Sequence, residues 1–194
     1  MIDDVDTQNL SDADLVRLTL ENQSNFLYLV DRYKSRLMNY IRRLTNINDA
    51  DIEDILQEVF IKVYLNLNDF NSDLKFSSWI YRITHNQVIS SYRKLKARPE
   101  GYAVNIDDKA ALNLAADIDI MAGTDLEITK QKINKVLNGL DRKYRDILIL
   151  KFLEEKNYQE ISDIIKKPAG TVASIINKAK QEFKKEFIQY KIIL

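Results

Sequence analysis

Residues 157–183, NYQEISDIIKKPAGTVASIINKAKQEF, contain the pattern that decides the fold. Asn157 stands three positions before Glu160, the spacing of a capping box, in which two side chains satisfy backbone N–H groups at a helix start. Proline is tolerated in the first turn of a helix but not in its interior, so Pro168 marks the start of a second helix. A short helix, a tight break and a longer helix predict a helix-turn-helix.

The second of these helices has two different faces. Its apolar residues share one side at the 3.6-residue period: Val172, Ile175, Ile176, Ala179 and Phe183. The side chains that point away are hydroxyls, amides and cations: Ser174, Asn177, Lys178, Gln181 and Lys185. Such groups can hydrogen-bond base edges and phosphates in a major groove. The alternative is an ordinary solvated face, because helix-turn-helix geometry also occurs in proteins that do not bind DNA.

Helical periodicity continues through most of the chain. Apolar residues recur at three- and four-residue steps, and only 4 Gly and 2 Pro are available for the turns of a many-stranded fold, so the sequence predicts an all-α protein. Asn48 and Asp49 are suitable caps for one helix, and Gly139 and Asp141 are a suitable stop and start between two others. The expected helices are two within 12–45, then 49–67, 76 to about 97, 126–138, 141–153, 158–166 and 168–188.

The length of 194 residues allows one large domain or two small ones, and the charge is unevenly distributed along the chain. The net charge is zero, with 29 basic and 29 acidic side chains, but residues 98–124 carry 2 basic and 5 acidic side chains, whereas residues 125–194 carry 15 and 10. We expect one helical domain over 1–97, an acidic flexible linker over 98–125 that can hold one short helix, and a second helical domain over 126–194.

The composition excludes several classes of protein. Without cysteine there are no disulfides, zinc-thiolate sites or thiol nucleophiles. The acidic N-terminus and the lack of any run of about 18 apolar residues argue against export and membrane insertion, so we expect a cytoplasmic protein. The single histidine and the absence of a glycine-rich phosphate loop leave no metal, cofactor or catalytic site to assign, and we expect no enzymatic activity.

A second stretch, FSSWIYRITHNQVISSYRKLKARP (residues 76–99), also separates its side chains. One sector is apolar, and another gathers polar and basic residues: Arg82, His85, Asn86, Arg93 and Lys96. The family resemblance described below implies a reason for this edge: cations suit phosphates, and planar or amide groups suit the exposed bases of single-stranded DNA. Trp79 borders the apolar sector, and we expect it to pack in the core rather than to contact DNA.

Three blocks follow one another in a recognisable order: DADIEDILQEVFIKVY (49–64), FSSWIYRITHNQVISSYRK (76–94) and LDRKYRDILILKFLEEKNYQEISDIIKKPAGTVASIINKAKQEF (140–183). They resemble the second and fourth conserved regions of the bacterial sigma-70 family. The short two-domain form resembles its extracytoplasmic-function (ECF) subgroup, over about residues 12–97 and 126–187. The resemblance implies an alternative sigma factor that binds RNA polymerase core enzyme and promoter DNA, and it implies an anti-sigma factor as a further partner.

The resemblance also assigns roles to individual residues. The surface for the coiled coil of the polymerase's largest subunit corresponds to Asp51, Asp54, Gln57 and Glu58. Recognition and melting of the minus-ten element correspond to Asn71, Lys75, Arg82, His85, Asn86, Arg93 and Lys94. Recognition of the minus-thirty-five element corresponds to Thr171, Ser174, Asn177, Lys178, Gln181 and Lys185. The first set also makes sense physically, because Asp51, Asp54 and Glu58 share a side of their helix and offer a basic partner an acidic patch.

The sequence departs from the family pattern at three positions. Ser90 stands where an aspartate is usual, and Ala173 and Ile175 replace two cations of the recognition helix. Each lost phosphate contact lowers affinity and its salt dependence, so we predict weak minus-thirty-five binding, supported by Lys178, Lys180, Lys184 and Lys185. Two alternatives therefore stay open: a stand-alone helix-turn-helix regulator, and a degenerate sigma-like protein that binds polymerase or an anti-sigma factor without initiating transcription.

Overall fold

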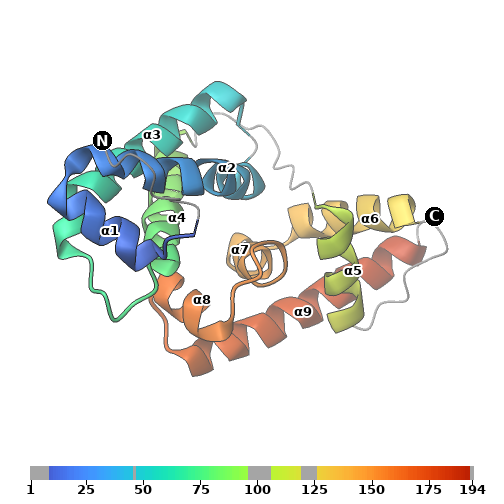
Figure 1. The fold of residues 1–194 in the computed structure, drawn as a ribbon. Coiled ribbons are helices and arrows are strands. Elements are labelled where there is room, and N and C mark those ends of the chain that lie inside the picture. Colours follow the sequence, from blue (N-terminus) through green and yellow to red (C-terminus); the bar gives the residue numbers. More distant parts are fainter. Residues whose placement is uncertain (1–8, 46, 96–105, 119–125, 193–194) are drawn as a thin grey trace. The chain divides into compact units, whose positions relative to one another are not determined.

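The computed structural model describes residues 9–45, 47–95, 106–118 and 126–192 (Figure 1). Every regular element within these ranges is a helix, which confirms the all-α class. By its internal contacts the chain divides into two compact units, Met1–Ile41 with Ile47–Arg98, and Arg42–Asn46 with Pro99–Leu194.

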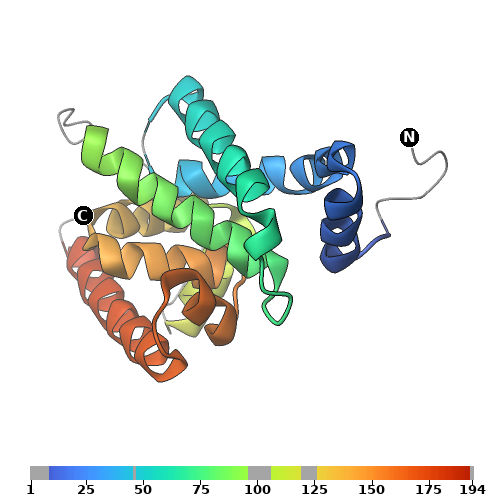
Figure 2. The ribbon, with the colours of Figure 1, turned by 90° about the vertical axis from the view of Figure 1, so that its left-hand side faces the viewer.

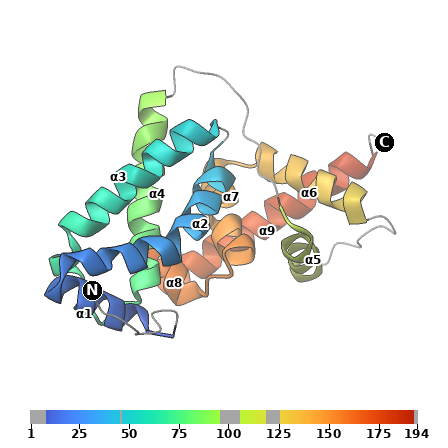
Figure 3. The same cartoon turned by 45° about the horizontal axis from the view of Figure 1, so that its top comes forward.

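The first unit is built from the N-terminal helices. They are α1 (Asp12–Glu21), η1 (Gln23–Asn25), α2 (Phe26–Leu44, whose last turn groups with the second unit), α3 (Asp49–Leu65), η2 (Leu67–Asp69) and α4 (Phe76–Leu95). The side chain of Asn48 caps α3 by accepting from the backbone N–H of Asp51, as the sequence predicts. Helices α3 and α4 lie side by side (Figures 1 and 3). The two helices that carry the predicted polymerase and minus-ten residues are therefore packed against each other.

Aromatic rings fill the core of the first unit. Trp79 is 6% exposed, and its ring centroid lies 5.3 Å from that of Phe70 and 5.6 Å from that of Phe76. Phe76 in turn meets Tyr33 edge-on, at 5.5 Å between centroids. The expected packing of Trp79 in the core is confirmed. The start of α4 is thereby fixed to α2 by a cluster of rings, an arrangement that stabilises beyond the apolar area it buries.

The second unit contains the helix-turn-helix. Its elements are α5 (Asp108–Asp117), α6 (Leu126–Gly139), α7 (Arg142–Leu148), the π-helical turn η3 (Ile149–Leu153), α8 (Tyr158–Ile165) and α9 (Ala169–Ile192). The capping box of Asn157 and Glu160 forms as predicted. Lys166 ends α8 in the left-handed conformation (φ 54°), and the carbonyl of Pro168 accepts the first hydrogen bond of α9 from Val172 at 3.0 Å. Helix α8 meets the start of α9 across this turn (Figure 2).

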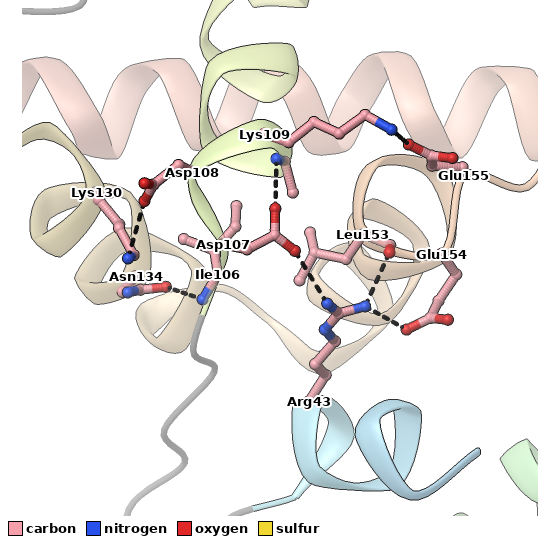
Figure 4. Close-up of polar contacts among 11 residues, drawn as sticks. Arg43, Ile106, Asp107, Asp108, Lys109, Lys130, Asn134, Leu153, Glu154 and Glu155 are labelled. Carbon is pink, nitrogen blue, oxygen red and sulfur yellow. Dashed lines mark hydrogen bonds and ion pairs between the residues drawn. The ribbon is translucent and has the colours of Figure 1, made fainter. Parts of the chain in front are cut away.

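Part of the expected linker folds onto the second unit as α5. The helix is held against α6 and η3 by a buried apolar stripe: Ile106, Ala110, Ala111, Leu114, Ala115 and Ile118. Alanines at half of these positions let the helix approach closely. Polar contacts surround the stripe: Asn134 accepts from the N–H of Ile106 at 2.9 Å, and ion pairs join Lys130 to Asp108 and Lys109 to Glu155 (Figure 4). The other residues of 98–125 lie outside the described part of the chain.

Arg43, in the last turn of α2, also belongs to the second unit. Its guanidinium donates from Nη1 to the carbonyl of Leu153 at 2.8 Å and to Glu154 at 2.7 Å, and from Nη2 to Asp107 at 3.2 Å (Figure 4). Arg43 therefore satisfies a carbonyl at the end of η3 and contacts Asp107, whose side chain caps α5.

A buried carboxyl lies in the first turns of α7. Asp146 is almost fully enclosed, and its Oδ2 lies 3.3 Å from Nε of Arg142, while Arg145 lies beside it, also buried. Burial raises the pKa of Asp146 to about 6, because removal from water disfavours the charged carboxylate by more than the two arginines favour it.

Candidate functional site: polar faces of α9, α3 and α4

The outward face of α9 brings together the full set of residues predicted for the minus-thirty-five element. Thr171, Ser174, Asn177, Lys178, Gln181 and Lys185 are all exposed. On the opposite side Val172, Ile176, Ala179 and Phe183 are completely or almost completely buried. That apolar side packs against α6, α7 and α8, so the polar side necessarily faces solvent. Ile175 lies half-buried at the edge between the two sides.

The cations of α9 do not share one environment. Lys178 and Lys185 are exposed on the polar face. Lys180, in contrast, is 25% exposed, and its Nζ lies 2.7 Å from Oδ2 of Asp117 on α5. We expected this lysine to support DNA binding, but its ammonium is paired with a carboxylate of α5, the helix within the expected linker. Ser174 donates its hydroxyl to the carbonyl of Gly170 at 3.0 Å and keeps an oxygen free to accept.

The four residues predicted for polymerase binding lie on one side of α3. Asp54, Gln57 and Glu58 are exposed and Asp51 is half-buried, with its Oδ2 accepting from Asn48 at 3.0 Å. The apolar residues of α3 occupy the opposite side: Ile52, Ile55, Leu56, Val59 and Val63. The result is an exposed patch of carboxylates and an amide, the complement of a basic surface.

The exposed sector of α4 is narrower than the sequence implies. Asn86 and Ser90 are exposed and Arg82 is half-buried, and their spacing of four residues places them along one line. His85 is not part of this line: it is 7% exposed, its Nδ1 lies 3.0 Å from the hydroxyl of Tyr40, and the two rings stack. The structure therefore keeps His85 away from Arg82 and Asn86, because α4 is packed on most of its circumference.

The remaining residues predicted for the minus-ten element lie at the two ends of α4. Asn71 and Lys75 are exposed in the loop before the helix, where the side chain of Asn71 accepts from the N–H of Asp73 at 2.9 Å and shapes the turn. The side chains of Arg93 and Lys94 lie outside the described residues.

Gln87 of α4 is a polar residue that the sequence reasoning missed. It is 3% exposed, donates to Oε2 of Glu58 and accepts from Nζ of Lys62, both on α3. The available signal was its position seven residues after Ile80, on a buried line of the helix, where an amide requires partners.

Two family models match the chain: Sigma-70 region 2 over residues 29–98 and Sigma-70 region 4 over residues 130–183. The first match contains α3 and α4, and the second contains the helix-turn-helix. A curated relative, the ECF RNA polymerase sigma factor SigW of Bacillus subtilis (strain 168), is 33% identical over 175 residues, which cover 85% of this chain and 90% of the relative. The chain belongs to the ECF sigma factors of the sigma-70 family.

Solved structures share the fold of this sigma factor. CnrH, solved in complex with the cytosolic domain of CnrY, gives a TM-score of 0.63 at 22% identity and covers 90% of this chain and 95% of its own. The sigma factor RpoE of Bartonella quintana, solved in complex with the anti-sigma factor NepR, gives a TM-score of 0.57 at 17% identity, with 84% and 96% covered.

Membership of the family argues against one of the two alternatives left open by the sequence, the stand-alone regulator. A stand-alone helix-turn-helix regulator leaves the match to Sigma-70 region 2 unexplained. Sigma factors direct transcription initiation by binding polymerase and promoter DNA and have no enzymatic activity, in line with the prediction. In the described part of the chain, no helix is long and apolar enough to cross a membrane, and no cluster of three or more His, Asp or Glu could hold a metal.

Proposed function

We propose that this sigma factor divides its work among three helices: α3 binds core polymerase, α4 with its preceding loop recognises and opens the minus-ten element, and α9 recognises the minus-thirty-five element. The observation that carries the proposal is the outward face of α9. All six residues expected to contact the minus-thirty-five element are exposed on a helix whose opposite face is buried, and this helix is the second of the helix-turn-helix. Amides and hydroxyls there suit base edges, and Lys178 and Lys185 suit phosphates.

The α3 face supplies the polymerase contact. Asp54, Gln57 and Glu58 are exposed and adjacent, so they can meet a basic partner without rearrangement of the helix. On α4, Arg82 and Asn86 supply a cation and an amide along one exposed line, which suits a single strand held after melting. Of the residues assigned to the minus-ten element, His85 contributes through the core: its contact with Tyr40 fixes α4 to α2.

We further propose a cytoplasmic location and control by an anti-sigma factor. RpoE of Bartonella quintana was solved in complex with the anti-sigma factor NepR, and CnrH with the cytosolic domain of CnrY. Both proteins share the fold of this chain. An inhibitor that covers the α3 or α9 face would keep the sigma factor from polymerase or promoter.

Single substitutions separate the polymerase role from the DNA role. Asp54→Ala should weaken binding of the full chain to core polymerase, whereas Glu53→Ala is the matched control, because Glu53 is an exposed carboxylate of α3 outside the proposed face. Gln181→Ala should leave core binding intact and weaken protection of the minus-thirty-five region in a holoenzyme footprint. Gln189→Ala, on the same helix beyond the helix-turn-helix, is its control. Equal behaviour of each variant and its control would contradict the proposed division of roles.

A further inference from the structure

A buried amide joins the two helices that carry the proposed polymerase and minus-ten surfaces. Gln87 of α4 is almost fully buried, yet both ends of its amide reach α3: the nitrogen donates to Glu58 and the oxygen accepts from Lys62. The same nitrogen lies 3.2 Å from the hydroxyl of Ser91, one turn further along α4. Every polar atom of the Gln87 side chain is therefore engaged.

This arrangement constrains Glu58. The carboxylate belongs to an exposed residue, and an exposed glutamate samples several rotamers whose ordering costs free energy on binding. Gln87, in contrast, is held by the packing of α4 and loses hydrogen bonds if Glu58 swings away, which is costly for a buried amide. The hydrogen bond therefore holds one oxygen of Glu58 against α4 and leaves the carboxylate in a preset position on the α3 face.

Lys62 adds to the same constraint. Glu58 and Lys62 are four residues apart on α3, the spacing at which the two side chains commonly pair with each other on a helix surface. Here the amide of Gln87 bonds to both side chains. Its oxygen accepts from the ammonium of Lys62, and its nitrogen donates to the carboxylate of Glu58. Glu58 is thereby held toward α4 by a neutral donor.

We propose that Gln87 is a positioning residue for polymerase binding, which acts by orienting Glu58. The inference rests on the proposed function of the α3 face and assigns to α4 a part in core binding as well as in promoter opening. If Gln87 acts through Glu58, substitution of Gln87 should weaken the binding of core polymerase only in a chain that still carries Glu58.

A double-mutant cycle on the full chain tests this dependence. We expect Gln87→Leu, which keeps the side-chain size and removes the hydrogen bonds, to weaken core binding about 5- to 10-fold, the effect of losing one typical hydrogen bond. Glu58→Ala should weaken binding by a similar factor, and the double variant should be no weaker than Glu58→Ala alone. A second cycle with Gln57→Ala is the matched control: Gln57 is exposed on the same face, so its loss and that of Gln87 should multiply.

The outcomes are distinguishable. If Gln87→Leu multiplies with Glu58→Ala as it does with Gln57→Ala, Gln87 acts only by supporting the fold, and the proposal is wrong. Thermal unfolding of each variant identifies such a general effect directly. If Glu58→Ala binds core like wild type, nothing remains for Gln87 to position and the inference also fails. The proposed role of the α3 face stands in that case if Asp54→Ala and Gln57→Ala still weaken binding, and falls with it if they do not.

Discussion

The salt dependence of promoter binding should report which lysines of α9 reach phosphates. Lys178 and Lys185 are exposed on the polar face, and Lys180 is paired with Asp117. Each phosphate neutralised on duplex DNA contributes about 0.9 to the slope of log affinity against log salt concentration. We therefore expect Lys178→Ala and Lys185→Ala each to reduce the slope for holoenzyme on promoter DNA by about 0.9, and the double variant to reduce it by about 1.8.

These slopes translate into measurable affinities. Between 50 and 200 mM salt, one phosphate contact accounts for about a 3.5-fold loss of affinity, and two contacts account for about a 12-fold loss. Asp117→Ala should change the slope in the opposite direction. It releases Lys180 to contact a phosphate, so the slope should become steeper by up to about 0.9. The contribution of Lys180 to DNA binding is therefore set by α5.

Fluorescence anisotropy of labelled promoter DNA with preformed holoenzyme, at several potassium chloride concentrations, measures these slopes. Gln181→Ala is the matched control: it lies on the same exposed face but is neutral, so affinity should fall at every salt concentration with the slope unchanged. A double variant of Lys178 and Lys185 with the wild-type slope would refute the reasoning, since the α9 face would then not lie along the phosphates.

Three further predictions concern stability and strand opening. Asn157→Ala should lower the free energy of unfolding by about 1 kcal/mol in urea through loss of the helix cap, whereas Asn113→Ala, at an exposed position of α5, should change it little; equal effects would contradict the role of the cap. The folded-state pKa of Asp146, about 6, lies above its ordinary value of 3.8, so the folded state binds the proton more tightly and stability should fall as pH rises through this interval. The free energy of unfolding of Asp146→Asn should rise by about 2 kcal/mol relative to that of wild type between pH 4.5 and 7. A difference between the two proteins that does not change with pH would show that the carboxyl is not desolvated. Arg82→Ala should reduce the permanganate reactivity of minus-ten thymines, which reports strand opening, and leave the affinity for core polymerase unchanged. A loss of core affinity instead would show that Arg82 belongs to the polymerase interface.

Local sequence rules located most of the helices and the best part of the candidate site. The boundaries around Asn48, Gly139, Asp141 and Pro168 follow from capping and proline chemistry, which depends on a few neighbouring residues. The α9 face was predictable for the same reason: one strongly apolar side fixes the orientation of the helix, and the exposed residues are then determined by the 3.6-residue period.

The features that sequence reasoning did not provide, namely the burial of His85, the contacts of Gln87 and the docking of α5, depend on residues distant in the sequence. His85 occupies a polar position of α4, but Tyr40 on α2 offers its ring a hydrogen-bonding partner in the core. The partners of Gln87 lie on α3, so its role depends on the packing of α3 against α4. Helix α5 lies in a segment whose acidic composition favoured a linker, yet its alanines pack against α6 and η3, and its charges find partners on three other segments. Periodicity within one helix does not contain this information.

Run-off transcription tests the central claim most directly. Purified core polymerase, incubated with this chain and genomic DNA fragments, should produce discrete transcripts that are absent with core alone, and Asp54→Ala should reduce them by weakening core binding while Glu53→Ala leaves them unchanged. Stable binding of the chain to core polymerase with no transcript from any fragment would contradict the account and identify a sigma-like protein that does not initiate transcription.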